Sequence, residues 1–183
     1  YSFFRAPKGR RAFSYPNILL QRGFETPVPI AYIEECKWGL IKYSYFISLQ
    51  SSYRRNFYEF GNADVNDCRD VVIAFARYTA RLHESDIMHR DYSPGNILFD
   101  KIDGEYHFML VDINRMSFGK ISIDMGCANF ARLWGQKAFF ELLAREYARN
   151  TDEQYCVDKV LAHRKKFWIY FAKKHQVKYK LEL

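Results

Sequence analysis

The chain has 183 residues, of which 49% are hydrophobic and 18% aromatic, and its formal net charge is +7. This size and composition suit one compact domain, alone or with a small appendage, and exclude a disordered or fibrous chain. No apolar run reaches the roughly 18 residues of a transmembrane helix, and the first residues lack the apolar segment of a signal peptide. We therefore expect a soluble protein that is not exported.

The first third of the chain predicts a helix and a hairpin. Residues 10–22 indicate a helix that ends at Gly23, because glycine is a common helix stop. Pro16 lies inside this segment, which leaves open a shorter helix over residues 15–22. A hairpin is expected around Gly39, because it is flanked by β-rich runs at residues 30–34 and 40–49. A connector or short helix should follow at residues 50–63.

The rest of the chain predicts one long helix, short strands and then more helices. Residues 64–85 carry apolar residues at helical spacing. Short strands, the last two joined by an Asp103-Gly104 turn, are expected at residues 87–88, 97–99 and 107–111. Further helices are expected at residues 122–134, 136–149 and 152–175. This order predicts an α+β fold whose helices gather toward the C-terminus.

The cysteines predict neither a zinc site nor a redox pair. Their wide spacing matches no metal-binding or Cys-x-x-Cys pattern, and we expect buried free thiols at Cys36, Cys68, Cys127 and Cys156.

The segment IMHRDYSPGNILFD, residues 87–100, has the pattern of a phosphoryl-transfer loop. Phosphoryl transfer needs a carboxylate to orient the attacking hydroxyl and oxygen ligands for magnesium. Asp91 and Asn96 have the spacing of protein-kinase catalytic loops, and Asp112 follows the next apolar strand. The three residues are therefore candidates for one base and two metal ligands. The surrounding order of helix, loop, turn and strand argues against a purely structural polar turn.

Four segments resemble one kinase family. HRDYSPGNILF, LVDINRM, TPVPIAYIE and GCANFARLWG are similar to the bacterial lipopolysaccharide kinases, which phosphorylate Kdo or heptose in the lipid A inner core and belong to the protein-kinase-like superfamily. The resemblance implies a protein-kinase-like fold with a mostly helical C-lobe, and ATP and Mg²⁺ as cofactors. It also implies that Asp91 accepts the proton of a sugar hydroxyl and that Asn96 and Asp112 bind magnesium.

The same resemblance implies a nucleotide site. Leu98 would lie beneath the adenine, and backbone groups of the hinge would recognise its edge at Leu49, Gln50 and Ser51. Within the catalytic loop, His89 is expected to hold the backbone by hydrogen bonds rather than to act as a base, and Arg90 to form a local salt bridge.

The resemblance divides the chain into a truncated N-lobe at residues 1–49, made of one helix and a hairpin, and a C-lobe at residues 50–183. The glycine-rich loop and the phosphate-gripping lysine of the family should precede the helix at residues 10–22. No acid occurs between Lys8 and Gly23 to pair with such a lysine. We therefore expect the chain to start after the third strand of the lobe, and a longer parent protein to carry the rest.

Departures from protein kinases bear on the acceptor. Ile113-Asn114 follows Asp112 in place of Phe-Gly, which restricts the backbone, because only glycine adopts all φ values at low cost. Ser93 stands where serine/threonine kinases usually carry a lysine, and no Ala-Pro-Glu follows. A small or lipid-linked acceptor therefore fits better than a protein.

The end of the chain is basic and aromatic. Aromatic residues at positions 167 to 171 lie between two groups of cations, Arg164, Lys165 and Lys166 before them and Lys173 and Lys174 after them. This pattern suits an interfacial helix on an anionic membrane. It equally suits a terminal helix that packs its aromatic residues on the C-lobe and exposes its lysines, and the sequence leaves both open.

The favoured function is an ATP-dependent kinase acting on Kdo or heptose of the lipopolysaccharide inner core. We expect it in the cytoplasm, peripheral to the inner membrane, with a lipid-linked sugar substrate and no nucleic acid partner. Two alternatives remain open: a small-molecule kinase of the aminoglycoside-phosphotransferase or RIO-like type, and a pseudokinase or binding module.

Overall fold

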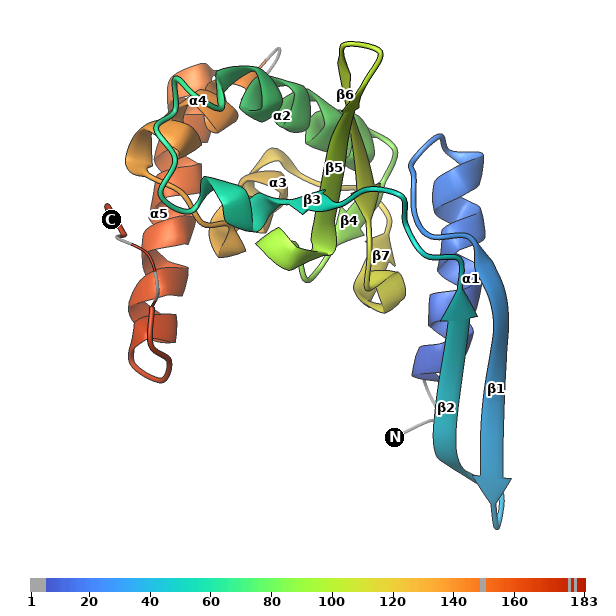
Figure 1. Ribbon diagram of the computed structural model, residues 1–183. Helices are drawn as coiled ribbons and strands as arrows, with labels where there is room; N and C mark the ends of the chain where they lie inside the picture. The colour runs from blue at the N-terminus through green and yellow to red at the C-terminus, as the bar shows by residue number, and fades with distance from the viewer. Residues whose placement is uncertain (1–5, 149–150, 178, 180) are drawn as a thin grey trace.

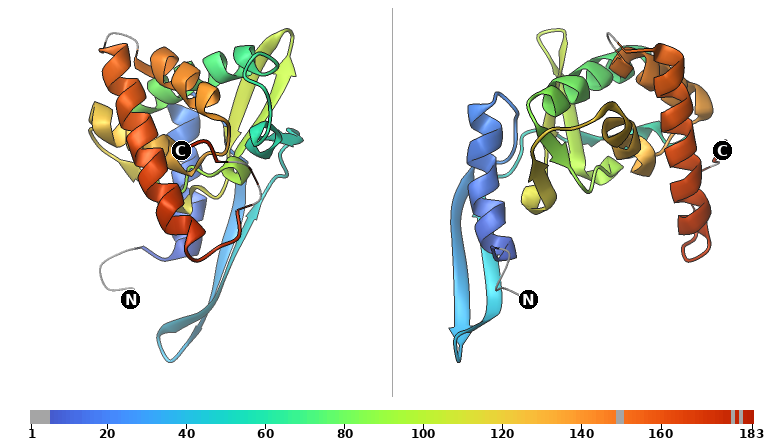
Figure 2. Two further views of the ribbon diagram at one scale, coloured as in Figure 1. Left: turned by 90° about the vertical axis from the view of Figure 1, so that its left-hand side faces the viewer. Right: turned by 180° about the vertical axis from the view of Figure 1, so that it is seen from behind.

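The computed structural model describes residues 6–148, 151–177, 179 and 181–183, which form two unequal parts. The smaller part contains helix α1 (Lys8–Gln21) and the antiparallel strands β1 (Pro29–Lys37) and β2 (Leu40–Ser48). Figure 1 shows this hairpin projecting away from the larger, mostly helical part, and Figure 2 shows the same separation from two further sides.

Helix α1 continues through Pro16, so the shorter helix over residues 15–22 is wrong. Its buried positions recur at helical spacing: Gly9 lies against the hairpin and Leu19 belongs to the core of the larger part. This packing offsets the cost of an internal proline. Gly9 approaches the hairpin so closely that a Cβ would collide with Ser44 Oγ. The predicted stop is confirmed: Gly23 has a φ of +77°, and the N–H of Phe24 donates to the carbonyl of Leu19.

The predicted hairpin is confirmed. Trp38 and Gly39 connect β1 and β2, and both have positive φ, at 55° and 75°. A two-residue turn with this backbone matches the right-handed twist of the flanking strands. The hairpin is joined to the larger part through the segment after α1, where the N–H of Leu110 donates to the carbonyl of Glu25 over 3.0 Å.

The larger part contains two small sheets beside a long helix. The predicted helix at residues 64–85 is confirmed as α2 (Arg69–Glu84), which starts later than expected, and the 3-10 helix Phe57–Phe60 falls in the predicted connector. One sheet has the order β3-β5-β6 and the other pairs β4 with β7. The strands are β3 (Arg55–Asn56), β4 (Ile87–His89), β5 (Ile97–Ile102), β6 (Glu105–Leu110) and β7 (Met116–Phe118). The sequence did not predict the short strands β3 and β7.

Three helices complete the larger part, as expected. They are α3 (Ile123–Asn129), α4 (Lys137–Ala148) and α5 (Glu153–Ala172). Residues 122–134 do not form one helix, because a 3-10 turn at Phe130–Arg132 follows α3. The last residue of the predicted helix at 136–149 lies outside the described residues. In the described part of the chain, no helix is long and apolar enough to cross a membrane.

Aromatic side chains fill the core between α2, the β3-β5-β6 sheet and the C-terminal helices. Phe57 packs on Phe75 and on Phe99, with ring centroids 4.2 and 5.5 Å apart. Three of the cysteines are buried free thiols, as expected, but Cys36 is exposed. Cys36 lies in β1 beside the turn, where the structure provides no second layer to cover it.

Arg164 does not belong to the basic surface that the sequence predicts. Its side chain is 1% exposed, and its guanidinium donates to the carbonyl oxygens of Gly135 and Glu182 over 2.8 and 2.7 Å. Burial lowers the pKa of Arg164 to about 10. Arg164 therefore binds the chain end to the turn before α4, whereas the neighbouring lysines are exposed.

Replacement of Arg164 should destabilise the fold. Arg164→Gln removes a buried donor from two carbonyl groups, and we expect the free energy of unfolding to fall by about 2–4 kcal/mol. Lys165→Gln is the matched control, because Lys165 is exposed, and should change it by less than about 0.5 kcal/mol. Urea titrations followed by circular dichroism measure both. Equal stability of the two variants would contradict the structural role of Arg164.

Candidate active site

The loop between β4 and β5 brings two predicted residues together. The carbonyl of Asp91 accepts hydrogen bonds from the N–H of Ser93 and from Nδ2 of Asn96, each over 2.8 Å. Pro94 then begins a 3-10 turn, in which the N–H of Asn96 donates to the carbonyl of Ser93. The spacing of Asp91 and Asn96 thus closes a tight loop in which the amide of Asn96 folds back on Asp91.

His89 connects this loop to the strand that precedes Asp112. Nδ1 of His89 accepts a hydrogen bond from the N–H of Asp91 over 3.1 Å, and Nε2 donates to the carbonyl of Val111 over 2.9 Å. This pattern requires the neutral ring with its proton on Nε2. The ring is fully buried, and burial lowers the pKa of His89, which favours the neutral form.

Asp112 lies two residues after the end of β6, in the left-handed region, with a φ of 52°. Aspartate tolerates this conformation better than most residues. Nδ2 of Asn114 donates to the carboxylate of Asp112, a contact that the sequence did not predict. The N–H of Val111 also donates to the carbonyl of Asn96 over 3.0 Å. Val111 therefore has one hydrogen bond to His89 and one to Asn96, and these fix Asp112 relative to the catalytic loop.

A cavity of about 580 Å³ lies between the two parts of the chain and ends at Asp112. The structure brings the expected nucleotide residues together in its lining, namely Leu49, Gln50, Ser51 and Leu98. Helix α1 contributes Lys8 and the hairpin contributes Phe46. Asp91 and Asn96 are not among the lining residues. The cavity therefore reaches the candidate metal ligand Asp112 but stops short of the candidate base.

The carboxylate of Asp91 is held by two arginines. Arg115 Nη1 lies 3.2 Å from Oδ2, and Arg132 Nη1 lies 2.7 Å from Oδ1. The Asp91 side chain is 18% exposed, whereas those of Arg115 and Arg132 are 59% and 43% exposed. The local salt bridge that we expected of Arg90 is absent among the described residues, where Arg90 is exposed and only its backbone N–H donates, to the carbonyl of Arg115.

A buried chain of side chains supports the loop from behind. Nδ2 of Asn129 donates to the carbonyl of His89 over 2.9 Å, and Oδ1 of Asn129 accepts from Nε2 of His83 over 3.1 Å. Nδ1 of His83 then accepts from the hydroxyl of Tyr147 over 2.8 Å. Burial lowers the pKa of His83 to about 4. The neutral ring of His83 thus connects helix α2 to α3 and α4, and through Asn129 to the catalytic loop.

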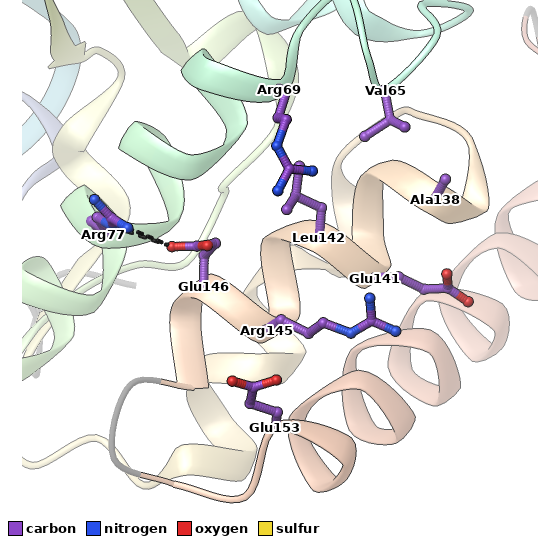
Figure 3. Close-up of a pocket in the computed structure, with 9 residues that line it drawn as sticks. All are labelled: Val65, Arg69, Arg77, Ala138, Glu141, Leu142, Arg145, Glu146 and Glu153. Carbon is purple, nitrogen blue, oxygen red and sulfur yellow. Dashed lines mark hydrogen bonds and ion pairs between the residues drawn. The ribbon is translucent and has the colours of Figure 1, made fainter.

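A larger hollow of about 680 Å³ lies elsewhere, between α2, α4 and the start of α5. Figure 3 shows arginine and glutamate side chains around it, with Arg77 paired to Glu146 over 2.9 Å. Its ionisable lining residues are balanced in charge: Arg69, Arg77, Arg145, Glu141, Glu146 and Glu153. It contains none of the predicted site residues, so the smaller cavity at Asp112 is the candidate active site.

Comparisons with known proteins bear on the family and on the fold of this chain. A family model described as "Lipopolysaccharide kinase (Kdo/WaaP) family" matches residues 17–133, more than half of the chain. The structure "WaaP in complex with acyl carrier protein" is similar with a TM-score of 0.65 and 15% identity, over 92% of this chain and 77% of that chain. The Rio2 kinase-ADP/Mg²⁺-phosphoaspartate complex from Chaetomium thermophilum gives a TM-score of 0.48 and 14% identity, over 84% of this chain and 44% of that one. A comparison with curated proteins gives no match.

The architecture and the WaaP match define a protein-kinase-like fold of the α+β class, as the sequence predicts. The matched family model goes further. The chain belongs to the lipopolysaccharide kinase (Kdo/WaaP) family, and so to the phosphotransferases of the kinase type.

The buried His83 should make stability depend on pH. Its folded pKa of about 4 lies below the ordinary value of 6.5, so the unfolded chain takes up a proton first as the pH falls. The contribution of His83 to the free energy of unfolding is fully present above about pH 6.5 and is lost as the pH falls toward 4. The total loss is on the order of 3 kcal/mol. Urea titrations between these pH values should show a shallower pH dependence for His83→Gln.

The exposed His175 provides the control for this experiment. His175→Gln should keep the pH dependence of the unsubstituted chain. Identical pH dependence in the chain with and without His83 would contradict the assignment of a neutral, buried ring.

Proposed function

We propose that this chain transfers a phosphoryl group from ATP, with Mg²⁺, to a hydroxyl of Kdo or heptose in the lipopolysaccharide inner core. The observation that carries the proposal is the link between the two carboxylates. His89 bonds to the backbone N–H of Asp91 and to the carbonyl of Val111, the residue before Asp112. The candidate base is therefore fixed relative to Asp112, the candidate metal ligand that lines the cavity.

The cavity suits a nucleotide in size and lining. Its volume of about 580 Å³ is within the range of about 300–1,000 Å³ that is usual for small-molecule sites. Leu98 supplies an apolar surface for the adenine, and the backbone of Gln50 and Ser51 follows the end of β2, beyond the paired strand. Lys8 lines the same cavity at the start of α1 and is available to the phosphates.

Asp112, which lines the cavity, and Asn96, which lies in the neighbouring loop, suit magnesium. Mg²⁺ prefers oxygen ligands and usually takes one or two carboxylates, together with water and substrate phosphates. Asp112 offers an exposed carboxylate, and Asn96 offers an amide oxygen, because its Nδ2 is the atom that bonds to Asp91. Within the described ranges, no group of three His, Cys, Asp or Glu residues could hold a metal by itself, which favours a site completed by the nucleotide.

Asp91 is the proposed proton acceptor. ATP would supply the phosphoryl group, and the bound Mg²⁺ would neutralise the charge on its phosphates. Asp91 orients the acceptor hydroxyl and receives its proton as the hydroxyl oxygen bonds to phosphorus and the bond to the leaving ADP oxygen breaks. The proposed lobe boundary, between residues 1–49 and 50–183, falls at the cavity wall, where Leu49 and Gln50 both line it.

Calorimetric titration with Mg-ATP tests the nucleotide site. Asp112→Asn keeps a residue that tolerates positive φ but removes the charge, and we expect it to weaken Mg-ATP binding by about tenfold or more. Asp103→Asn is the matched control, since Asp103 also has a positive φ but lies in the β5-β6 turn, and should leave binding unchanged. No binding by the unsubstituted chain, or equal binding by both variants, would argue against the proposed site.

We also propose that α5 places the protein on the cytoplasmic face of an anionic membrane. Lys165 and Lys166 lie in α5, Lys173 and Lys174 follow its end directly, and all four are exposed. Ile169 and Tyr170, which lie between these pairs, are 46% and 61% exposed. Trp168 is buried, so part of the aromatic group packs on the lobe while the exposed face keeps the features of an interfacial surface.

Vesicle binding tests this second proposal. Replacing Lys165, Lys166, Lys173 and Lys174 together with Gln should weaken binding to phosphatidylglycerol vesicles by at least about tenfold, because each lysine near such a surface contributes about 1 kcal/mol. Flotation or sedimentation with the vesicles measures the effect.

An equal loss of charge elsewhere provides the control. The control variant replaces four exposed lysines elsewhere with Gln, namely Lys37, Lys42, Lys101 and Lys120. It should bind the vesicles nearly as well as the unsubstituted chain does. Equal weakening in both quadruple variants would show that net charge, and not the face of α5, determines binding.

A further inference from the structure

The ion pairs around Asp91 leave an excess of positive charge beside the candidate base. One carboxylate faces the guanidinium groups of Arg115 and Arg132, and in the described part of the chain neither arginine has an ion pair with a second acid. Arg90, adjacent to Asp91 in the chain, is exposed as well. Two positive charges against one negative charge leave a site for one more anion.

In this arrangement the carboxylate of Asp91 is already engaged by two partners. Each of its carboxylate oxygens accepts a charge-assisted hydrogen bond, over 3.2 Å from Arg115 and 2.7 Å from Arg132. The two guanidinium groups thus occupy the oxygen atoms to which the hydroxyl of the acceptor would have to donate. A productive complex therefore needs a change in which at least one arginine leaves Asp91.

We propose that Arg115 and Arg132 form the binding site for an anionic group of the acceptor, a carboxylate or a phosphate next to the reacting hydroxyl, and that this group releases Asp91 by taking over the arginines. The inference rests on the proposed kinase function and specifies its acceptor class. Guanidinium groups bind carboxylates and phosphates in the same two-point geometry, so an incoming anion competes directly with the carboxylate of Asp91.

The positions of the arginines suit this exchange. Arg115 ends the 3-10 turn that begins after Asp112, and Arg132 ends the turn after α3, so the anion site lies between the metal-ligand segment and the C-terminal helices. Both side chains are substantially exposed, at 59% and 43%, which leaves them free to change partner. The guanidinium of Arg132 also lies 5.4 Å from the ring centre of Phe167 in α5, which supports it from one side.

The nucleotide cavity is separate from this anion site. Neither arginine lines the cavity at Asp112. The proposal therefore expects Arg115 and Arg132 to affect acceptor binding and to leave Mg-ATP binding unchanged.

Binding of paired probes tests the proposal. The full chain, with Mg-ADP present, is titrated with the methyl glycoside of Kdo and with the methyl ester of the same compound, which lacks the charge. Mannose 6-phosphate and mannose form the second pair and represent an acceptor that carries a phosphate. In at least one pair the charged probe should bind about tenfold more tightly than its neutral partner, because charge-assisted hydrogen bonds are lost in the latter. The pair that shows the preference identifies the anion.

Variants assign the preference to the two arginines. Arg132→Gln and Arg115→Gln should each reduce it, and the double variant should abolish it while keeping the affinity for Mg-ATP. Arg145→Gln is the matched control, since Arg145 is exposed and lines the other hollow in Figure 3, and it should keep the full preference.

Three results would overturn the proposal. The first is equal or absent binding of the charged and neutral probes. The second is a preference for the charged probe that survives in the double variant. The third is a double variant that keeps this preference but loses affinity for Mg-ATP, which would assign the arginines to the nucleotide. The proposed function fails separately, if the unsubstituted chain transfers no phosphate to any sugar. The binding ratio still reports on the anion site in that case.

Discussion

The hydrogen bonds of one neutral imidazole hold the candidate active site together. His89 accepts from the backbone of Asp91 and donates to the backbone of Val111, so the catalytic loop and the strand end at Asp112 move as one unit. These roles require one protonation state and one tautomer: burial favours the neutral ring, and the two hydrogen-bond partners set the tautomer. The chain from Asn129 through His83 to Tyr147 extends the same constraint into the helical core. The loop geometry is thus a property of the whole larger part and not of the motif alone.

Local patterns in the sequence predicted much of this structure. Helical spacing predicted α2, and Gly39 and Gly23 predicted the hairpin turn and the end of α1, because each depends on neighbouring residues. The motif spacing also placed Asp91 and Asn96 in one loop and Asp112 at a strand end. Arg132 and Asn129 were missed because they reach the loop from about 40 residues away, and no periodicity encodes such contacts. Arg164 was misplaced because a cation in a basic run is indistinguishable from its exposed neighbours until its carbonyl partners are known.

The site separates two tasks that kinases must coordinate. The candidate nucleotide-binding residues line a cavity between the two parts of the chain, whereas Asp91 lies outside its lining and is covered by arginines from two separate turns. If Asp91 is the base, as proposed, such an arrangement would keep it occupied when only nucleotide is bound and would limit transfer of the phosphoryl group to water. The acceptor, and not the nucleotide, would then complete the reactive geometry, and selectivity would depend on charge at the acceptor.

The hairpin of β1 and β2 has a consequence for the behaviour of this chain in solution. Among the described residues it is a two-stranded ribbon with no strand paired to either outer edge, and its side chains Ile33, Trp38, Tyr45 and Ile47 are 55%, 91%, 51% and 47% exposed. Open edges that carry apolar residues are templates for pairing with another chain. Self-association of this chain should therefore begin at the hairpin and increase with concentration, while the helical part remains folded. Solutions of this chain should therefore be kept dilute, or the ribbon should be covered by a binding partner.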